Sequence, residues 1–342
     1  MISWNVGGLN SCITDADFLT HVHGHDLIFL CETWQKVDSS FSLQNYKSVS
    51  IPRPESMRSK RGHGGICLFY KSELDNGITI LKTDKNGMLC IKPSKCFLGF
   101  TTDIYMCFVY IPPNNSVYFN KHNVRLFEQL EQIIRCYSGN GKVIVMGDLN
   151  ARCGERSDFI ETNGYEEFLP TLDTDNFSIN DIPHRFTMDK TINSSGIKLL
   201  DVCRSSDLKI VNGRIGDDAG IGSYTFLSPS GRSLIDYVLM PVELFAIVGE
   251  FIVHDIQACS AHAPIQLNLV TGRASKHSEV NEHATRRICW DTNKVSEFRE
   301  LIESEINNIE ELINNIITSE IDIDSGGIGT ISINLYNKAF KV

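Results

Sequence analysis

Polar side chains of catalytic types stand at the ends of short apolar runs in this sequence. Carboxylate, imidazole and phenol groups transfer protons in enzyme sites, and amides hold polar ligands. Because a sheet presents the residues at its strand ends along a rim, these groups could form one site. They are Asn5, Glu32, Tyr110, Asp148, Asn150, Asp236 and His262.

Asp236 is the most informative of these residues because it lies inside an apolar run, residues 234–239. Burying a carboxylate without a partner is strongly unfavourable, so Asp236 must hold one. A histidine is a natural partner, and His262 comes directly before the last apolar run. A lone carboxylate at a strand end is more often a turn former or helix cap. The joint pattern is therefore more informative than any single member.

Apolar runs bounded by turn residues recur up to about residue 270 and predict β-strands. Helical periodicity is rarer: it extends over residues 117–137, and residues 197–203 continue a similar pattern. Many strands with few helices predict two packed mixed sheets with flanking helices, an α/β sandwich, rather than a doubly wound sheet. The clearest strand runs are residues 2–6, 27–31, 66–70, 78–81, 88–91, 105–110, 143–146, 208–211, 233–239, 251–253 and 265–269.

The composition changes after Val270, which predicts a domain over residues 1–271 and an appendage over 272–342. The appendage begins as a polar linker. Ile and Leu then recur at helical spacing over residues 298–317, opposite a Glu-rich face, which predicts a C-terminal amphipathic helix. Its apolar stripe needs a cover, either the domain itself or a protein partner. Its acidic face excludes a basic membrane-surface helix.

The composition is that of an ordinary globular protein, since 42% of the 342 residues are hydrophobic and 22% are charged. No apolar run approaches the ~20 residues of a membrane span, and no secretory leader opens the chain. The 11 cysteines include no CxxC pair, which argues against a zinc ribbon or a disulfide framework. We expect an intracellular protein of the nucleus or cytoplasm, not a secreted one. The net charge of −10 argues against coating nucleic acid through bulk charge but allows a locally basic groove.

In their order along the chain, the strand-end motifs resemble the endonuclease/exonuclease/phosphatase superfamily. More narrowly, they resemble the AP-endonuclease-like endonuclease domain of LINE-type (non-LTR) retrotransposons. The resemblance covers residues 1–271 and implies a four-layer α/β sandwich with its site at one sheet rim. It also implies Mg²⁺-dependent nicking of double-stranded DNA that leaves a 3′-hydroxyl. The motifs are residues 3–6, 30–34, 61–65, 110–113, 146–151, 223–226, 233–237 and 260–264.

The same resemblance implies a role for each strand-end residue. Glu32 would be the main ligand of Mg²⁺, with Mn²⁺ as an alternative ion, and Asn5 would assist it. Asp148 would orient or deprotonate the attacking water. Asn150 and Tyr110 would hold phosphate oxygens.

His262 would hydrogen-bond a non-bridging phosphate oxygen as charge builds in the transition state, and Asp236 would orient His262 or support the site. Two positions depart from the family, because Gly7 and Ala261 stand where it commonly has Asp. A carboxylate at position 261 would fix the tautomer and charge of the histidine. We therefore expect impaired activity unless Asp236 compensates.

Three further residues are weaker candidates for substrate contacts. Arg61 could contact phosphate or simply lead into the strand over 66–70. Arg232 could reach the DNA backbone or remain solvated at a hairpin tip. Trp34 could stack on substrate or pack beneath the rim.

Two other functions stay open. A catalytically silent module on the same fold could bind nucleic acid and recruit a partner through the helix over 298–317. Gly7, Ala261 and the acidic charge favour that alternative. A phosphoesterase acting on a lipid or a nucleotide would keep the fold and change the substrate.

Overall fold

Two six-stranded sheets form the frame of the protein. The chain divides into two units, Met1–Ser275 and Lys276–Val342, of which the first is described below. Arg61, the first part of the predicted helix over 117–137 and the predicted helix over 298–317 lie outside the described residues. The computed structural model describes residues 1–35, 41–53, 63–84, 86–114, 116, 125–160, 182–229 and 231–271.

The first sheet consists of β1 (Ile2–Asn5), β2 (Leu27–Cys31), β3 (Tyr46–Ile51), β4 (Ile66–Lys71), β13 (Val248–Val253) and β14 (Ile265–Leu269). The second consists of β5 (Ile78–Asp84), β6 (Met88–Pro93), β7 (Ile104–Tyr110), β8 (Lys142–Asp148), β9 (Lys209–Ile210) and β12 (Asp236–Met240). A separate hairpin is formed by β10 (Phe226–Ser228) and β11 (Gly231–Ser233). The α-helices are α1 (Ala16–Val22), α2 (Lys95–Leu98), α4 (Leu126–Ser138) and α5 (Ser194–Ser205). Short 3₁₀ helices cover Leu9–Ser11, Ser72–Gly77, Gly216–Asp218 and Val242–Ile247.

Both large sheets are mixed. The strand orders are β13-β14-β1-β2-β4-β3 and β5-β6-β7-β8-β12-β9. Each sheet contains one parallel pair, β1 with β2 and β7 with β8, and its other pairs are antiparallel. A parallel pair needs a crossover connection, which α1 provides in the first sheet and α4 in the second.

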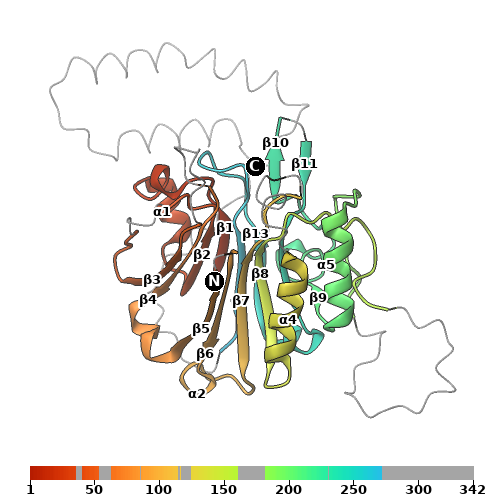
Figure 1. The fold of residues 1–342 in the computed structure, drawn as a ribbon, viewed down its shortest axis with the longest axis horizontal. Coiled ribbons are helices and arrows are strands. Elements are labelled where there is room, and N and C mark those ends of the chain that lie inside the picture. The colour runs from red at the N-terminus through yellow and green to blue at the C-terminus, as the bar shows by residue number, and fades with distance from the viewer. Residues whose placement is uncertain are drawn as a thin grey trace, which may run out of the picture. The chain divides into compact units, whose positions relative to one another are not determined.

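The sheets pack face to face and helices cover their outer faces, which gives four layers (Figure 1). Between the sheets, Phe29 of β2 stacks on Phe108 of β7 with ring centroids 5.2 Å apart. On the outer face of the first sheet, Phe18 of α1 stacks on Trp4 at 5.4 Å. On the second sheet, α4 and α5 bury their apolar stripes. The predicted α/β sandwich is confirmed.

The helices form where their apolar spacing allows one buried face. In α4, the buried residues are Leu126, Phe127, Leu130, Ile133 and Ile134, which recur at helical spacing. The second predicted helix, over 197–203, is longer than expected and begins at Ser194, because the side chain of Asn193 caps it. Among the described residues, no helix is long and apolar enough to cross a bilayer.

The prediction of a single strand over residues 233–239 was wrong. The strand is interrupted between β11 and β12, because the backbone N–H groups there donate to side chains and not to a neighbouring strand. The backbone N–H of Leu234 donates to Asp189, and those of Ile235 and Asp236 donate to the hydroxyl of Thr225.

Among the described elements, β3, α1, the short α2 and the 3₁₀ helices were not predicted. β3 lies at the edge of its sheet with an exposed polar face, so its apolar content is low. α1 is a short helix with only two fully buried residues, although Asp15 caps it.

We predict that Gly147→Ala destabilises the domain by roughly 2–4 kcal/mol. Gly147 has a φ of 148°, and an added Cβ would lie 1.9 Å from the carbonyl oxygen of Val109 on the paired strand. The measurement is the free energy of unfolding in urea. Gly139→Ala is the matched control, because nothing lies within 4 Å of its added Cβ, and it should stay within about 0.5 kcal/mol of the parent. An equal effect of the two variants would contradict the prediction.

Candidate active site

The predicted site residues gather at one rim, where the edges of the two sheets meet. Because β1 and β2 run parallel, as do β7 and β8, the carboxyl ends of each pair reach the same edge of their sheet. Asn5 ends β1 and Glu32 follows β2 in the first sheet, whereas Tyr110 ends β7 and Asp148 ends β8 in the second. β12 runs antiparallel to β8, which places Asp236 opposite Asp148.

Asp148 is fully buried and links the two sheets. Its Oδ2 accepts a hydrogen bond from Nδ2 of Asn5 at 2.9 Å. Its Oδ1 accepts from the backbone N and from Nδ2 of Asn150, both at 3.0 Å. The Asn5 amide is held in turn, because its Oδ1 accepts from the backbone N of Gly7 at 3.1 Å. Donors on both oxygens therefore fix the orientation of the carboxylate.

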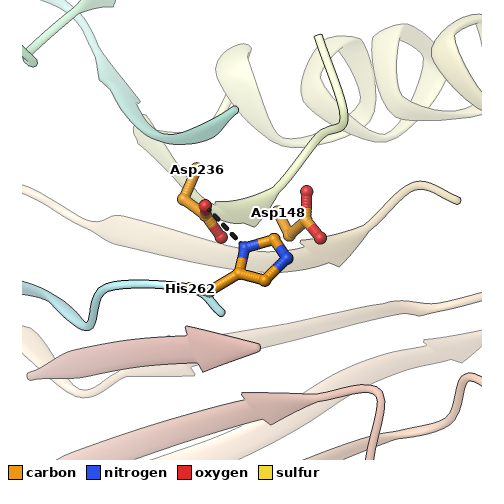
Figure 2. A group of neighbouring side chains, drawn as sticks. All are labelled: Asp148, Asp236 and His262. Carbon is orange, nitrogen blue, oxygen red and sulfur yellow. Dashed lines mark hydrogen bonds and ion pairs between the residues drawn. The ribbon is translucent and has the colours of Figure 1, made fainter. Parts of the chain in front are cut away.

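Asp236 and His262 form a second link between the sheets, drawn in Figure 2, with Oδ2 of the aspartate 2.9 Å from Nδ1 of the histidine. The hydroxyl of Ser260 accepts from the backbone N of His262 at 3.0 Å. Burial lowers the pKa of His262, but the charge and hydrogen bond of Asp236 outweigh it and raise this pKa to about 9. The imidazole is therefore protonated at neutral pH.

The ligand atoms of Asp148, Asp236 and His262 lie within 4.8 Å of one another. Burial raises the pKa of Asp148, and the charge of Asp236 raises it further, whereas the charge of His262 and the amide donors lower it. The charge on each of these groups therefore affects the protonation of its neighbours. A protonated imidazole has no lone pair for a metal, so this cluster is better suited to holding protons than to holding an ion.

Glu32 takes part in the third link between the sheets. The hydroxyl of Tyr110 donates to its Oε1 at 2.5 Å, and Nε1 of Trp34 donates to its Oε2 at 3.2 Å. Burial raises the pKa of Tyr110 well above its ordinary value, and the charge of Glu32 adds to this effect. The phenol therefore keeps its proton and acts as a donor. We refer to Asn5–Asp148, Asp236–His262 and Tyr110–Glu32 as the rim pairs.

Three residues around these pairs have left-handed backbone conformations. The φ angles are 52° for Glu32, 52° for Trp34 and 45° for Asn150. Such a conformation costs a non-glycine residue roughly 1–3 kcal/mol and persists only where the surrounding structure imposes it. Backbone hydrogen bonds impose it after β2, where Glu32 O accepts from Gly8 N at 2.8 Å and Trp34 N donates to Gly64 O at 2.9 Å.

The rim pairs border a cleft of about 870 Å³. Tyr110 and Asp236 stand behind its lining and act through Glu32 and His262. The lining residues used in the argument are Asn5, Glu32, Asp148, Asn150, Arg152 and His262.

The remaining sequence candidates lie in different surroundings. The ring of Trp34 covers Gly8, where an added Cβ would lie 2.6 Å from Cε3, and it is not part of the described lining of the cleft. This placement agrees with packing beneath the rim. Arg232 lies exposed on β11. Ala261 lines the cleft, and Asp236 supplies the acceptor for His262 Nδ1 that an alanine cannot.

Asn193 was not predicted, although it positions the loop after β8. Its Oδ1 accepts from the backbone N of Arg152 at 3.1 Å and of Gly196 at 2.7 Å, and its Nδ2 donates to the carbonyl of Asn150 at 3.4 Å. An asparagine before a helical pattern is a recognisable cap signal. The sequence around Asn193 does not indicate that this cap also contacts the site, because its partners there lie about 40 residues away.

Comparisons with known proteins agree with this geometry. The chain is similar to the AP endonuclease LMAP from Leishmania major, with a TM-score of 0.56, 16% identity and coverage of 78% of this chain and 86% of that chain. It is similar to the 3′ phosphatase NExo from Neisseria bound to a product DNA hairpin, with a TM-score of 0.50, 15% identity and coverage of 79% and 98%. It is also similar to the 3′-5′ exonuclease NExo from Neisseria meningitidis, with a TM-score of 0.50, 16% identity and coverage of 78% of this chain and 98% of that chain. These likenesses concern the fold.

No curated protein sequence matches the chain significantly. A family model described as the endonuclease/exonuclease/phosphatase family matches residues 2–262, a span that includes every strand of the two sheets except β14 and every member of the rim pairs. The chain therefore belongs to the endonuclease/exonuclease/phosphatase family.

Proposed function

We propose that this protein is a divalent-metal-dependent phosphodiesterase that nicks double-stranded DNA and leaves a 3′-hydroxyl. The observation that carries the proposal is the convergence of the three rim pairs at one cleft. They place a carboxylate free to bind a cation, a buried carboxylate able to take a proton and an imidazolium beside one another. Hydrolysis of a phosphodiester needs all three kinds of group.

The oxygen atoms of Glu32 and Asn5 fit a hard divalent cation. The Glu32 carboxylate keeps lone pairs beyond its bonds from Tyr110 and Trp34. Asn5 Oδ1 accepts one hydrogen bond from the described residues, that of Gly7. Mg²⁺ keeps several waters and needs only one or two protein oxygens, and Mn²⁺ accepts similar ligands. When bound, the cation would neutralise charge on the phosphate and on the leaving 3′-oxygen.

Asp148 is the candidate base for the attacking water. Its raised pKa favours taking up a proton, and its oxygens are held in place by Asn5 and Asn150. Both amide hydrogens of Asn150 are engaged, by Ile111 O at 2.9 Å and by Asp148. This geometry favours Asn150 as a positioning residue over the predicted role of holding phosphate. Tyr110 likewise donates to Glu32 and supports that carboxylate.

His262 is suited to bind a non-bridging phosphate oxygen in its protonated form. Asp236 accepts from Nδ1 and stabilises the positive charge, so that Nε2 remains as a donor. This contact supports a site that works without a carboxylate at position 261, in place of the impairment expected from Ala261. At Gly7, the other departure from the family, an added Cβ would have no atom within 4 Å, and the backbone has a φ of 52°.

We further propose that the domain, over residues 1–271, is a LINE-type retrotransposon endonuclease. The order and spacing of the strand-end motifs support this proposal. A DNA substrate is supported by two similar structures, one of an AP endonuclease and one of a phosphatase bound to a DNA hairpin. The segment 272–342 would be an appendage, and the helix over 298–317 a surface for a protein partner.

We predict Mg²⁺-dependent nicking of supercoiled plasmid that EDTA abolishes. Glu32→Ala should lower the nicking rate at least about 100-fold, because the main ligand of the cation is removed. Gel conversion of supercoiled to open-circular plasmid measures the rate, and extension by a polymerase tests for the 3′-hydroxyl. Glu128→Ala, on the exposed face of α4, is the matched control and should leave the rate unchanged. No nicking by the unmodified protein would sink the proposal and favour a silent binding module.

We predict opposite outcomes for two changes around His262. Asp236→Asn should lower the nicking rate at pH 7.5 by roughly 10²- to 10⁴-fold, whereas Ala261→Asp should change it by less than about tenfold, since Nδ1 already has an acceptor.

NMR titration of the metal-free protein supplies the matching pKa values. The His262 ring should lose its proton near pH 9 in the unmodified protein and at a clearly lower pH in Asp236→Asn, because burial is then balanced only by the smaller effects of the Asp148 and Glu32 charges on this pKa. The charged ring contributes stability below about pH 6.5, and this contribution is lost as the pH rises through 9. A large activation by Ala261→Asp would show that Asp236 does not compensate.

A further inference from the structure

Arg152 lies in the wall of the cleft and belongs to none of the rim pairs. It follows Asn150 by two residues, in the loop after β8, and its side chain is 31% exposed. Among the described residues that line the cleft, it is the one lysine or arginine. The lining also includes the carboxylates of Glu32 and Asp148. The cleft therefore combines carboxylates suited to a cation with a cationic group at Arg152.

Asp189 holds one edge of the Arg152 guanidinium in a bidentate pair. Nε lies 2.8 Å from Oδ2 and one terminal nitrogen, Nη2, lies 2.6 Å from Oδ1. The carboxylate is itself fixed, because it is almost completely buried and also accepts from the backbone N of Leu234 and of Thr191. No hydrogen bond to Nη1 is found among the described residues. Nη2 also lies 3.5 Å from the carbonyl oxygen of Arg232. Nη1 is therefore the nitrogen that can donate to an acceptor in the cleft, and the N–H groups of a guanidinium are strong donors to phosphate oxygens.

The backbone under Arg152 is held as firmly as its side chain. Asn193 bonds to both its N and its O, and an added Cβ at Gly196 would lie 1.8 Å from the Arg152 carbonyl oxygen. The separation between Arg152 and the Asp148 carboxylate is therefore fixed by the fold. The N-terminal end of α5 borders the same wall and adds to its positive potential.

We propose that Arg152, positioned by Asp189, binds a phosphate next to the one that is cleaved, so that the substrate is a polynucleotide strand and not a small ester with a single phosphate. A strand carries one phosphate per nucleotide and can place one at the catalytic cluster and another at Arg152. A small diester can reach only the first position. This inference rests on the proposed function and deepens it by naming a residue that binds the strand beyond the cleaved phosphate.

The test compares two substrates, a duplex oligonucleotide and bis(p-nitrophenyl) phosphate, which has one phosphate. Arg152→Gln should lower kcat/KM on the duplex by roughly 10- to 100-fold, the range of one charge-assisted contact, mainly through KM. The rate on the small diester should stay within about twofold. The slope of log affinity for the duplex against log salt should fall by about 0.9. Arg135→Gln, on the exposed face of α4, is the matched control and should leave the rate on both substrates unchanged.

The outcomes separate the inference from the function on which it rests. Equal losses on both substrates would show that Arg152 only supports the fold, and an unchanged rate on the duplex would overturn the inference alone. A protein that cleaves the small diester but not DNA would overturn both the inference and the DNA substrate of the proposed function, and would leave the phosphodiesterase activity standing. Failure of the unmodified protein on both substrates would overturn the proposed function as well. Arg152→Lys keeps the charge without the fork and should retain part of the duplex rate, which guards against misfolding of the glutamine variant.

Discussion

The rim pairs are the interactions on which the rest of the site depends. Each pair joins a residue in or near a strand of the first sheet to a residue of the second, so the groups of the candidate site also fix how the sheets meet. Burying the Asp148 and Asp236 carboxylates is tolerable only with partners in place, and those partners come from the opposite sheet. Packing of the sheets and geometry of the site therefore cannot vary independently.

A rigid interior makes this arrangement possible. Behind the rim, apolar side chains of both sheets interlock in one core, with Phe29 stacked on Phe108. This core holds the strand ends in conformations that the residues would not adopt alone, such as the left-handed backbone of Glu32 and of Asn150. Gly147 serves the same purpose, because only a residue without a side chain lets β7 approach the strand that ends in Asp148. Strain at the rim is offset by burial behind it.

The end of β8 and the loop after it join the buried carboxylate cluster to the wall of the cleft at Arg152. Within five residues they carry Asp148, Asn150 and Arg152, and Asn193 ties the loop backbone to the start of α5. The backbone of Arg152 is consequently held in a fixed place relative to the Asp148 carboxylate. Under the proposed function, a protein with a net charge of −10 would bind an anionic strand through local charges, without the bulk positive charge of a coating protein.

The strand ends, and with them most of the candidate site, could be predicted from the sequence. Apolar runs such as 27–31 and 143–146 can be recognised as strands from the sequence, because strand burial is a local pattern. These runs predicted that Glu32 and Asp148 lie at a rim. The cost of burying Asp236 correctly indicated a histidine partner. The contacts between groups far apart in the sequence could not be predicted. Asn5 and Asp148 are 143 residues apart, and the bond of Asn150 to Ile111, the bonds of Asn193 to Asn150 and Arg152, and the bidentate pair of Asp189 with Arg152 likewise arise from packing between distant segments. Local periodicity contains no information about such contacts, because it reports which face of an element is buried and not what covers it.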